Sequence, residues 1–169
     1  FYMLKIITLN LNGIRSAVKK GWLDWLVTQD ADIVCVQELK AQAADIDEAT
    51  RDARGAMTGY FHYAEKKGYS GVGLYSRRQP DQVIEGFGIP EFDAEGRYLE
   101  AQFKGLSVVS VYLPSGSSSE ERQQAKFRFL ALMAPHLVRL KAERDFILVG
   151  DVNIAHKEID LKNWKSNQK

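Results

Sequence analysis

Apolar residues recur along the chain in short runs that predict buried strands, and the first two runs flank a stretch with helical periodicity. The runs are Leu4–Leu9 and Asp32–Gln37, each rich in apolar and β-branched residues. Between them, Ser16–Gln29 has apolar side chains at helical spacing, which predicts one helix, weakened in its first half by Gly21. These side chains are Val18, Trp22, Trp25 and Leu26, and both tryptophans are expected in the core. A strand, a helix and a strand in this order favour a right-handed parallel crossover.

The middle of the chain predicts closely spaced strands. Residues 41–58 are rich in alanine, with Asp and Glu among them, which predicts a short helix within a long connection. Five short runs then alternate with turn residues, and such close spacing implies one antiparallel meander. The five runs are Tyr60–Ala64, Gly71–Ser76, Gln82–Phe87, Arg97–Phe103 and Ser107–Leu113.

A long helix and one last strand complete the pattern. Ser118 followed by Glu121 predicts a capping box at the start of the helix, and Pro135 is expected to kink or divide it. The apolar face of this helix is expected to contain Ala125, Phe129, Leu132 and Met133. Phe146–Val149 is an uninterrupted apolar run, which is typical of a central strand buried on both faces, and Gly150 is expected to end it.

Composition narrows the class of protein. The 169 residues suit one domain, and 45% hydrophobic with 27% charged residues is ordinary for a soluble globular protein. A net charge of +1 excludes an overall basic field, so a nucleic-acid-binding face would have to gather its basic residues locally. The single cysteine, Cys35, excludes an internal disulfide, and the sequence shows no signal peptide or membrane-length apolar run. We therefore expect a reducing, cytoplasmic location and no membrane partner.

Polar side chains follow three of the predicted strands at the point where each strand ends. Asn10 and Asn12 follow the first strand, Glu38 the second, and Asp151 and Asn153 the last. Side chains two positions apart in extended backbone point the same way, and ligands of open α/β sheets bind at the carboxyl ends of strands. Carboxylate and amide oxygens suit Mg²⁺ or Mn²⁺, whereas zinc would require clustered Cys and His. The pattern predicts a cation site able to polarise a phosphoryl oxygen.

These residues allow a catalytic interpretation and a purely structural one. Asp151 could take a proton from an attacking water and Asn153 could orient that water, while Tyr112, at another strand end, could donate to the same oxygens. Equally, Glu38 could be a solvated or helix-capping residue and Tyr112 a core aromatic residue. The two asparagines, Asn10 and Asn12, could simply form a turn before the following glycine.

Six motifs together resemble the exonuclease III family of abasic-site endonucleases, within a wider group of metal-dependent phosphoesterases that includes deoxyribonuclease I. They occur in the order of that family and span nearly the whole chain. They are Asn10-Leu11-Asn12-Gly13-Ile14-Arg15, Val36-Gln37-Glu38-Leu39-Lys40, Gly68-Tyr69-Ser70-Gly71-Val72-Gly73-Leu74, Gly96-Arg97, Tyr112-Leu113-Pro114 and Gly150-Asp151-Val152-Asn153-Ile154-Ala155-His156. Asn12 stands where bacterial relatives have Asn and animal relatives Asp, so the resemblance is to the bacterial type.

The resemblance implies a four-layer α/β sandwich of two packed mixed sheets flanked by helices. It implies a Mg²⁺- or Mn²⁺-dependent hydrolase of base excision repair, acting on double-stranded DNA with abasic or damaged 3′ ends. Such an enzyme cleaves 5′ to abasic sites, repairs 3′ ends and often has 3′-to-5′ exonuclease activity. By motif, the metal site would contain Glu38, Asn10, Asp151 and Asn153, and the catalytic residues would be Tyr112, Asp151 and Asn153. The DNA backbone would contact Arg15, Tyr69 and, as a weaker candidate, Lys20.

One departure from the family pattern concerns length. Family members extend well beyond this sequence, and their last third contains another strand-end Asp and a Ser-Asp-His segment that this chain lacks. We therefore expect residues 3–169 to be a single domain that is incomplete at its C-terminus. We expect the parent protein to be a monomer, and Phe1 and Tyr2 to be residues added ahead of Met3.

Two other functions stay open. One is a nucleic-acid-binding regulator on the same fold that has lost catalysis, although the retained Glu38 and Asp151 argue against it. The other is a phosphoesterase of the same wider group acting on lipid or inositol phosphates.

Overall fold

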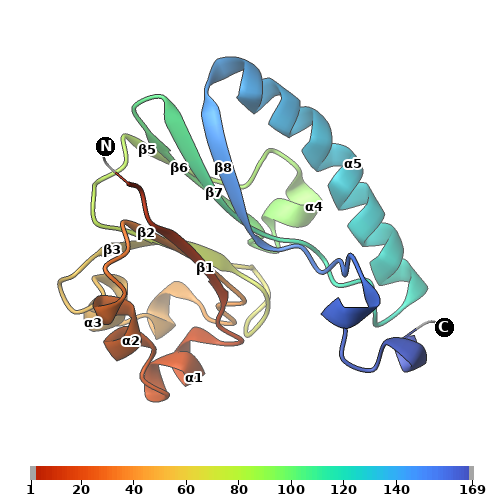
Figure 1. The fold of residues 1–169 in the computed structure, drawn as a ribbon, viewed down its shortest axis with the longest axis horizontal. Coiled ribbons are helices and arrows are strands. Elements are labelled where there is room, and N and C mark those ends of the chain that lie inside the picture. The colour runs from red at the N-terminus through yellow and green to blue at the C-terminus, as the bar shows by residue number, and fades with distance from the viewer. Residues whose placement is uncertain (1–2, 168–169) are drawn as a thin grey trace.

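The computed structural model describes residues 3–167 and shows two four-stranded sheets packed face to face, with helices on both outer sides (Figure 1). The first sheet has the order β1 (Ile6–Asn10), β2 (Ile33–Gln37), β4 (Val72–Ser76) and β3 (Thr58–His62). The second has the order β5 (Gln82–Glu85), β6 (Tyr98–Phe103), β7 (Leu106–Tyr112) and β8 (Asp145–Asp151). The predicted four-layer α/β sandwich is confirmed. The prediction for Phe1 and Tyr2 lies outside the described residues.

Helices cover the outer face of each sheet. The first sheet is covered by α1 (Ile14–Lys19), α2 (Trp22–Thr28) and α3 (Glu48–Arg51), and the second by α4 (Pro90–Asp93) and α5 (Glu120–Glu143). Three short 3₁₀ helices complete the described chain: η1 (Ala43–Asp45), η2 (Glu158–Asp160) and η3 (Trp164–Asn167). In the part of the chain that is described, no helix is long and apolar enough to cross a membrane.

Alternation along the inner strands builds three apolar layers. In β2, Val34 and Val36 pack under α2, whereas Ile33 and Cys35 face the second sheet. Because both of its faces are buried, β2 is apolar at four consecutive positions before it ends in buried Gln37. Burial also raises the pKa of the Cys35 thiol to about 12, so this side chain is an inert part of the core.

The predicted parallel pair of strands is confirmed, but the prediction of a single helix between them is wrong. β1 pairs with β2 in parallel register, and Gly21, with φ 89°, separates α1 from α2. Within α2, Trp22 and Leu26 face the sheet, whereas Trp25 is 41% exposed and stacks on Trp22 with ring centroids 5.5 Å apart. At 100° per residue, position 25 lies at the border of the arc that positions 22, 23 and 26 bury.

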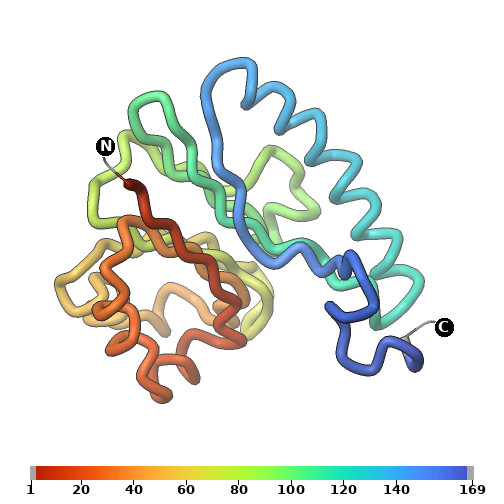
Figure 2. The backbone as a smooth tube through the Cα atoms, viewed as in Figure 1, coloured from red at the N-terminus to blue at the C-terminus, as the bar shows by residue number. Residues whose placement is uncertain are grey.

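The predicted antiparallel meander is divided between the two sheets. β3 pairs with β4, and β5, β6 and β7 pair in sequence, all antiparallel, but β4 and β5 belong to different sheets. Figure 2 shows the chain passing from one sheet to the other between these strands. Backbone hydrogen bonding to the second sheet starts at Asp81, whose N–H donates to the carbonyl of Gln102 at 2.7 Å. Strand periodicity fixes which face of a strand is apolar but not which strand pairs with it.

The long helix differs from its prediction in its N-cap and in one residue of its apolar face. Its N-cap is Ser119, whose hydroxyl accepts from the N–H of Arg122 at 3.2 Å, one residue later than expected. Leu132 is 37% exposed because it lies at the border of the arc of buried residues. That row is Ala125, Phe129, Met133 and Leu140. Pro135 does not divide the helix, which continues to Glu143.

Within residues 3–167, the last strand is an edge strand and not the predicted central strand. β8 lies at the edge of its sheet, pairs in parallel with β7 and continues through Gly150 to Asp151. Phe146 and Leu148 pack toward α5, but Ile147 is 37% exposed. Among residues 3–167, only β7 pairs with this strand.

Candidate active site

The carboxyl ends of four strands meet at one end of the sandwich. β1 runs parallel to β2 and β7 runs parallel to β8, and the sheets pack with β1 against β8 and β2 against β7. Figure 2 shows the first strand (red) and the last strand (blue) running toward the same end of the molecule. Asn10, Glu38, Tyr112 and Asp151 stand at these strand ends.

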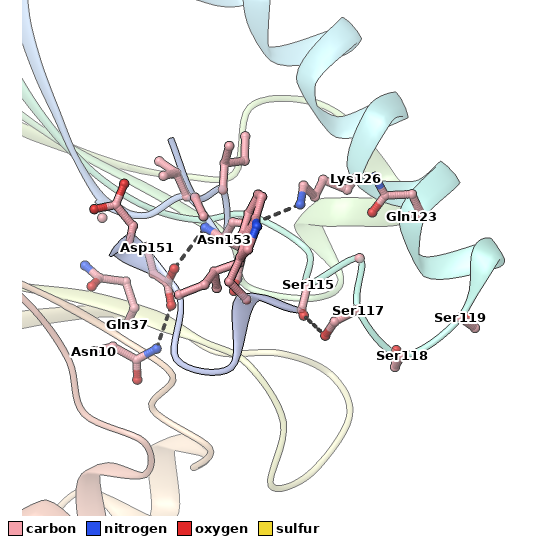
Figure 3. Close-up of a pocket in the computed structure, with 18 of the residues that line it drawn as sticks. Asn10, Gln37, Ser115, Ser117, Ser118, Ser119, Gln123, Lys126, Asp151 and Asn153 are labelled. Carbon is pink, nitrogen blue, oxygen red and sulfur yellow. Dashed lines mark hydrogen bonds between the residues drawn. The ribbon is translucent and has the colours of Figure 1, made fainter. Parts of the chain in front are cut away.

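Hydrogen bonds join these four residues into one cluster. The amide Nδ2 of Asn10 donates to Glu38 Oε1 at 3.0 Å and to Asp151 Oδ2 at 2.9 Å, the second bond being visible in Figure 3. The hydroxyl of Tyr112 donates to the same Glu38 Oε1 at 2.9 Å. The nitrogen of Asn10, rather than its oxygen, therefore faces the carboxylates, so this residue holds the two acids side by side.

Two similar turns follow β1 and β8. The N–H of Asn12 donates to Asn10 Oδ1 at 2.9 Å, and the N–H of Asn153 donates to Asp151 Oδ1 at 3.0 Å. Asn12 and Asn153 have φ values of 47° and 51°, so neither continues the extended backbone that the spacing of two suggested. In these Asx turns the side chain at the strand end fixes the residue two positions later. Asn153 in turn donates from Nδ2 to the carbonyl of Leu113 at 2.9 Å.

Left-handed backbone is concentrated around this cluster. Of the nine non-glycine residues with positive φ in the described chain, five lie at this end of the sandwich. They are Asn12, Glu38, Lys40, Ser70 and Asn153. Such conformations are costly for residues with a Cβ and persist where surrounding contacts enforce them. The N–H groups of Leu39 and Lys40 provide such contacts, because they donate to the carbonyls of Gly71 and Ser70 at 3.1 and 2.8 Å.

Lys40 is a member of the cluster that the sequence interpretation did not assign. Its ammonium lies 2.7 Å from Glu38 Oε2 and donates to Asn12 Oδ1 at 2.6 Å. Burial by itself would raise the pKa of Glu38, but hydrogen bonds from Lys40, Asn10 and Tyr112 and the charge of Lys40 outweigh it, so this pKa is lowered. Glu38 is therefore an ionised carboxylate at neutral pH. The only sequence signal for Lys40 was its position two residues after Glu38 in the motif Val36-Gln37-Glu38-Leu39-Lys40.

Tyr112 has the opposite electrostatic setting. Burial raises the pKa of its hydroxyl, and the hydrogen bond to Glu38 and the negative charge of Glu38 raise it further. The phenol therefore stays protonated and can act as a hydrogen-bond donor at neutral pH.

The donor set fits a hard cation that keeps most of its waters. Glu38 and Asp151 both accept a hydrogen bond from the amide of Asn10, and the ammonium of Lys40 forms an ion pair with Glu38 Oε2. Within the described residues no group of three or more His, Cys, Asp and Glu side chains forms a denser site. Mg²⁺ commonly binds through one or two carboxylates and several waters, so two acids suffice for it but not for zinc.

The three residues predicted to touch DNA have different surroundings. Arg15 lies beside the cluster, 3.3 Å from Asp45 and donating to the carbonyl of Lys40 at 3.3 Å. Lys20 is exposed at the C-terminal end of α1. The hydroxyl of Tyr69 is already engaged, because it accepts from Arg97 at 2.9 Å and from Arg122 at 3.0 Å.

A cleft of about 1420 Å³ opens beside the cluster (Figure 3). Asn10, Asp151 and Asn153 form one wall, and the serine-rich segment 115–119 with Gln123 and Lys126 forms another. Lys126 joins the walls by donating to the carbonyl of Asn153 at 2.8 Å. Of this segment, only Ser118 had a role predicted from the sequence, as a helix cap, and the place of the segment opposite the strand ends makes it part of the site.

Comparisons with known proteins show which proteins the chain is similar to. Residues 7–169 match the Endonuclease/Exonuclease/phosphatase family. The chain is 39% identical over 166 residues to an exodeoxyribonuclease of Bacillus subtilis, covering 98% of this chain and 64% of that protein. It is 37% identical over 170 residues to the DNA repair nuclease APEX1 of Danio rerio, covering 98% of this chain and 54% of that protein.

A solved structure shares the fold. An AP endonuclease from Archaeoglobus fulgidus superposes with a TM-score of 0.81 at 30% identity, covering 95% of this chain and 62% of that chain. The chain thus spans between about half and two thirds of the length of these three relatives.

Proposed function

Because the chain belongs to the endonuclease/exonuclease/phosphatase family, we propose that it forms the reaction centre of a metal-dependent DNA-repair phosphodiesterase that cleaves duplex DNA 5′ to abasic sites. The observation that supports this most directly is the hydrogen-bonded cluster of two carboxylates, one amide and one protonated phenol at four strand ends. The names of the relatives, which include exodeoxyribonucleases and AP endonucleases, support exonuclease activity on DNA and cleavage at abasic sites.

Glu38 and Asp151 would hold the cation, which we propose to be Mg²⁺ or Mn²⁺. The bound ion would stabilise negative charge on the phosphoryl oxygens. Asn10 keeps the two acids together through its two N–H bonds, and its own oxygen is fixed by the N–H of Asn12. Asn10 would therefore support the metal site by positioning the two acids.

The chain's own groups can move one proton and donate one hydrogen bond during hydrolysis. Asp151 would accept the proton of the attacking water as the water oxygen bonds to phosphorus, since a carboxylate within hydrogen-bond reach can act as a general base. The bond between phosphorus and the 3′ oxygen would break, and that oxygen would take a proton from solvent. Tyr112, protonated at neutral pH, would donate to a phosphoryl oxygen as negative charge develops there. The carboxamide of Asn153, fixed by Leu113, would orient the same phosphate.

The DNA backbone would lie across the strand ends, with phosphates held near Arg15 and Tyr69. Phosphate contacts carry no sequence information, so damage would be recognised by the shape of the backbone and the missing base. A sugar without a base leaves the stack at low cost, which favours abasic sites as substrates.

The decisive experiment is cleavage of a duplex with one abasic-site analogue by this chain, with Mg²⁺ and with EDTA. We expect Mg²⁺-dependent nicking that the Asp151→Ala variant loses by at least about 100-fold. Asp145→Ala is the matched control, because it removes an exposed carboxylate at the other end of the same strand. An inositol phosphate serves as the competing substrate for the wider family.

Each outcome has a definite meaning. Nicking that survives in Asp151→Ala would place the reaction elsewhere. Hydrolysis of the inositol phosphate without nicking would assign a different substrate class to the same site. A folded chain that binds the duplex without hydrolysing either substrate would favour the regulator, which Glu38 and Asp151 argue against.

A further inference from the structure

The most unusual buried group outside the cluster is a guanidinium. Arg97 is 1% exposed and is the largest of the fully buried side chains in the described chain. It directly precedes β6, between the candidate catalytic Tyr112 and the candidate DNA contact Tyr69. Arginine is almost never fully buried unless its charge is paired, so this position has a specific cause.

The guanidinium of Arg97 is bonded in three directions. Nε forms an ion pair with Glu95, Nη1 donates to the carbonyl of Tyr112 at 3.0 Å, and Nη2 donates to the hydroxyl of Tyr69 at 2.9 Å. The backbone repeats the link, because the N–H of Tyr112 donates to the carbonyl of Arg97 at 2.9 Å. One rigid planar group therefore fixes the backbone of one tyrosine and the hydroxyl of the other.

Both aromatic rings also pack on this charge. The Cζ of Arg97 lies 4.9 Å from the ring centroid of Tyr112 and 5.8 Å from that of Tyr69. Cation–π contacts of this kind hold the ring plane as well as the backbone. With the ring held in this way, the hydroxyl of Tyr112 lies beside Glu38 and donates to it at 2.9 Å.

We propose that Arg97 is a positioning residue that fixes Tyr112 against Glu38 and holds Tyr69 in a constant position relative to it. The inference rests on the proposed function, since it assigns Arg97 to the reaction of that same site. Through this group, phosphate contact at Tyr69 and chemistry at Tyr112 share one rigid support.

A purely stabilising role explains the arrangement less well. Desolvating a charge is expensive, and well-packed apolar residues often replace buried ion pairs without loss of stability. The geometry instead uses the fork of arginine, which a lysine ammonium cannot reproduce because it is a point charge. Arg122 reinforces the unit from α5, donating to the Tyr69 hydroxyl at 3.0 Å and lying 3.5 Å from Glu95.

The test compares Arg97→Lys and Arg97→Met with Arg144→Met as the matched control. Arg144 also donates to a backbone carbonyl, that of Phe103, but at the opposite end of the sandwich. We expect both Arg97 variants to lower kcat for nicking by on the order of 100-fold per folded molecule, because small misplacements of reacting groups have such effects. Arg144→Met should change thermal stability without changing kcat.

A double-mutant cycle decides whether Arg97 acts through Tyr112. In a Tyr112→Phe background, Arg97→Lys should change kcat by no more than about twofold, the scatter expected when no further interaction is lost. A full loss in that background would overturn the proposal, because Arg97 would then act independently of the phenol.

A second readout does not require nuclease activity. With 3-fluorotyrosine at all seven tyrosines, the ¹⁹F resonance of Tyr112 can be assigned as the one missing in Tyr112→Phe. We expect it to shift and broaden in Arg97→Lys and to stay unchanged in Arg144→Met. An unchanged resonance in folded Arg97→Lys or Arg97→Met would overturn the proposal, whereas the absence of nicking in the wild-type chain would contradict only the proposed function.

Discussion

Strands β1 and β8 end in the same kind of turn but present different chemistry. At each end the side chain of the last strand residue accepts from the N–H two positions later, at 2.9 Å for Asn10 and 3.0 Å for Asp151. The remaining side-chain atom is an amide nitrogen in Asn10 and a carboxylate oxygen in Asp151, and these two atoms bond to each other at 2.9 Å. A donor at one turn and an acceptor at the other allow two sheets to meet without charge repulsion.

The difference teaches how an acidic site is kept together. Glu38 and Asp151 would repel each other if nothing lay between them, and the two N–H groups of Asn10 satisfy one oxygen of each. If the two strands ended in the same residue, either two asparagines or two aspartates, the hydrogen bond between the turns would be lost. Each change should therefore have a predictable effect on activity or stability.

The largest effect is expected when both turns end in asparagine. Asp151→Asn keeps the turn but removes the candidate general base, so nicking should fall by about 10²- to 10⁴-fold. Thermal stability should fall far less than activity, because the N–H of Asn153 retains an oxygen acceptor and only the hydrogen bond from Asn10 to residue 151 is lost. Single-turnover nicking and a melting curve measure the two quantities, and equal losses of activity and stability would contradict this separation.

A smaller effect, on stability, is expected when both turns end in a carboxylate. Asn10→Asp replaces two N–H donors with a third negative charge, so the free energy of unfolding at pH 7 should fall by about 1.5–3 kcal/mol. Chemical denaturation in EDTA measures it. The exchange variant, Asn10→Asp with Asp151→Asn, restores one donor opposite the carboxylates and should recover part of this loss without recovering activity. A stable Asn10→Asp single variant would refute the bridging role of Asn10.

The smallest effect concerns acid stability and Lys40. Because the pKa of Glu38 is lowered in the folded chain, its contribution to stability is present above the usual glutamate pKa of about 4.3 and is lost as pH falls through the lowered value. Lys40→Met removes a hydrogen bond and a positive charge that lower this pKa, so acid unfolding should begin at higher pH. Melting temperatures from pH 7 to pH 3 in EDTA test this, with exposed Lys104→Met as control. Identical profiles for wild type and Lys40→Met would contradict it.

Local patterns predicted the elements well because a strand or helix reveals its buried face through its own period. The strands around Cys35 and Val109 were found in this way, and so were the polar residues that end them. The same reasoning was wrong for Trp25 and Leu132, which lie at the borders of buried arcs, where packing rather than period decides exposure. It was wrong for β8 because an apolar run does not distinguish a central strand from an edge strand.

The sequence by itself determined which polar groups end the strands, the family that these motifs resemble and the four-layer class of fold. Only the tertiary structure decided that the nitrogen of Asn10 faces both acids, that Lys40 rests on Glu38, and that Arg97 is enclosed by two tyrosines. Asn10 and Asp151 are 141 residues apart, and their bond depends on the relative position of two sheets. Local sequence fixes a side chain's type and strand, but the packing of one sheet on another fixes its partner.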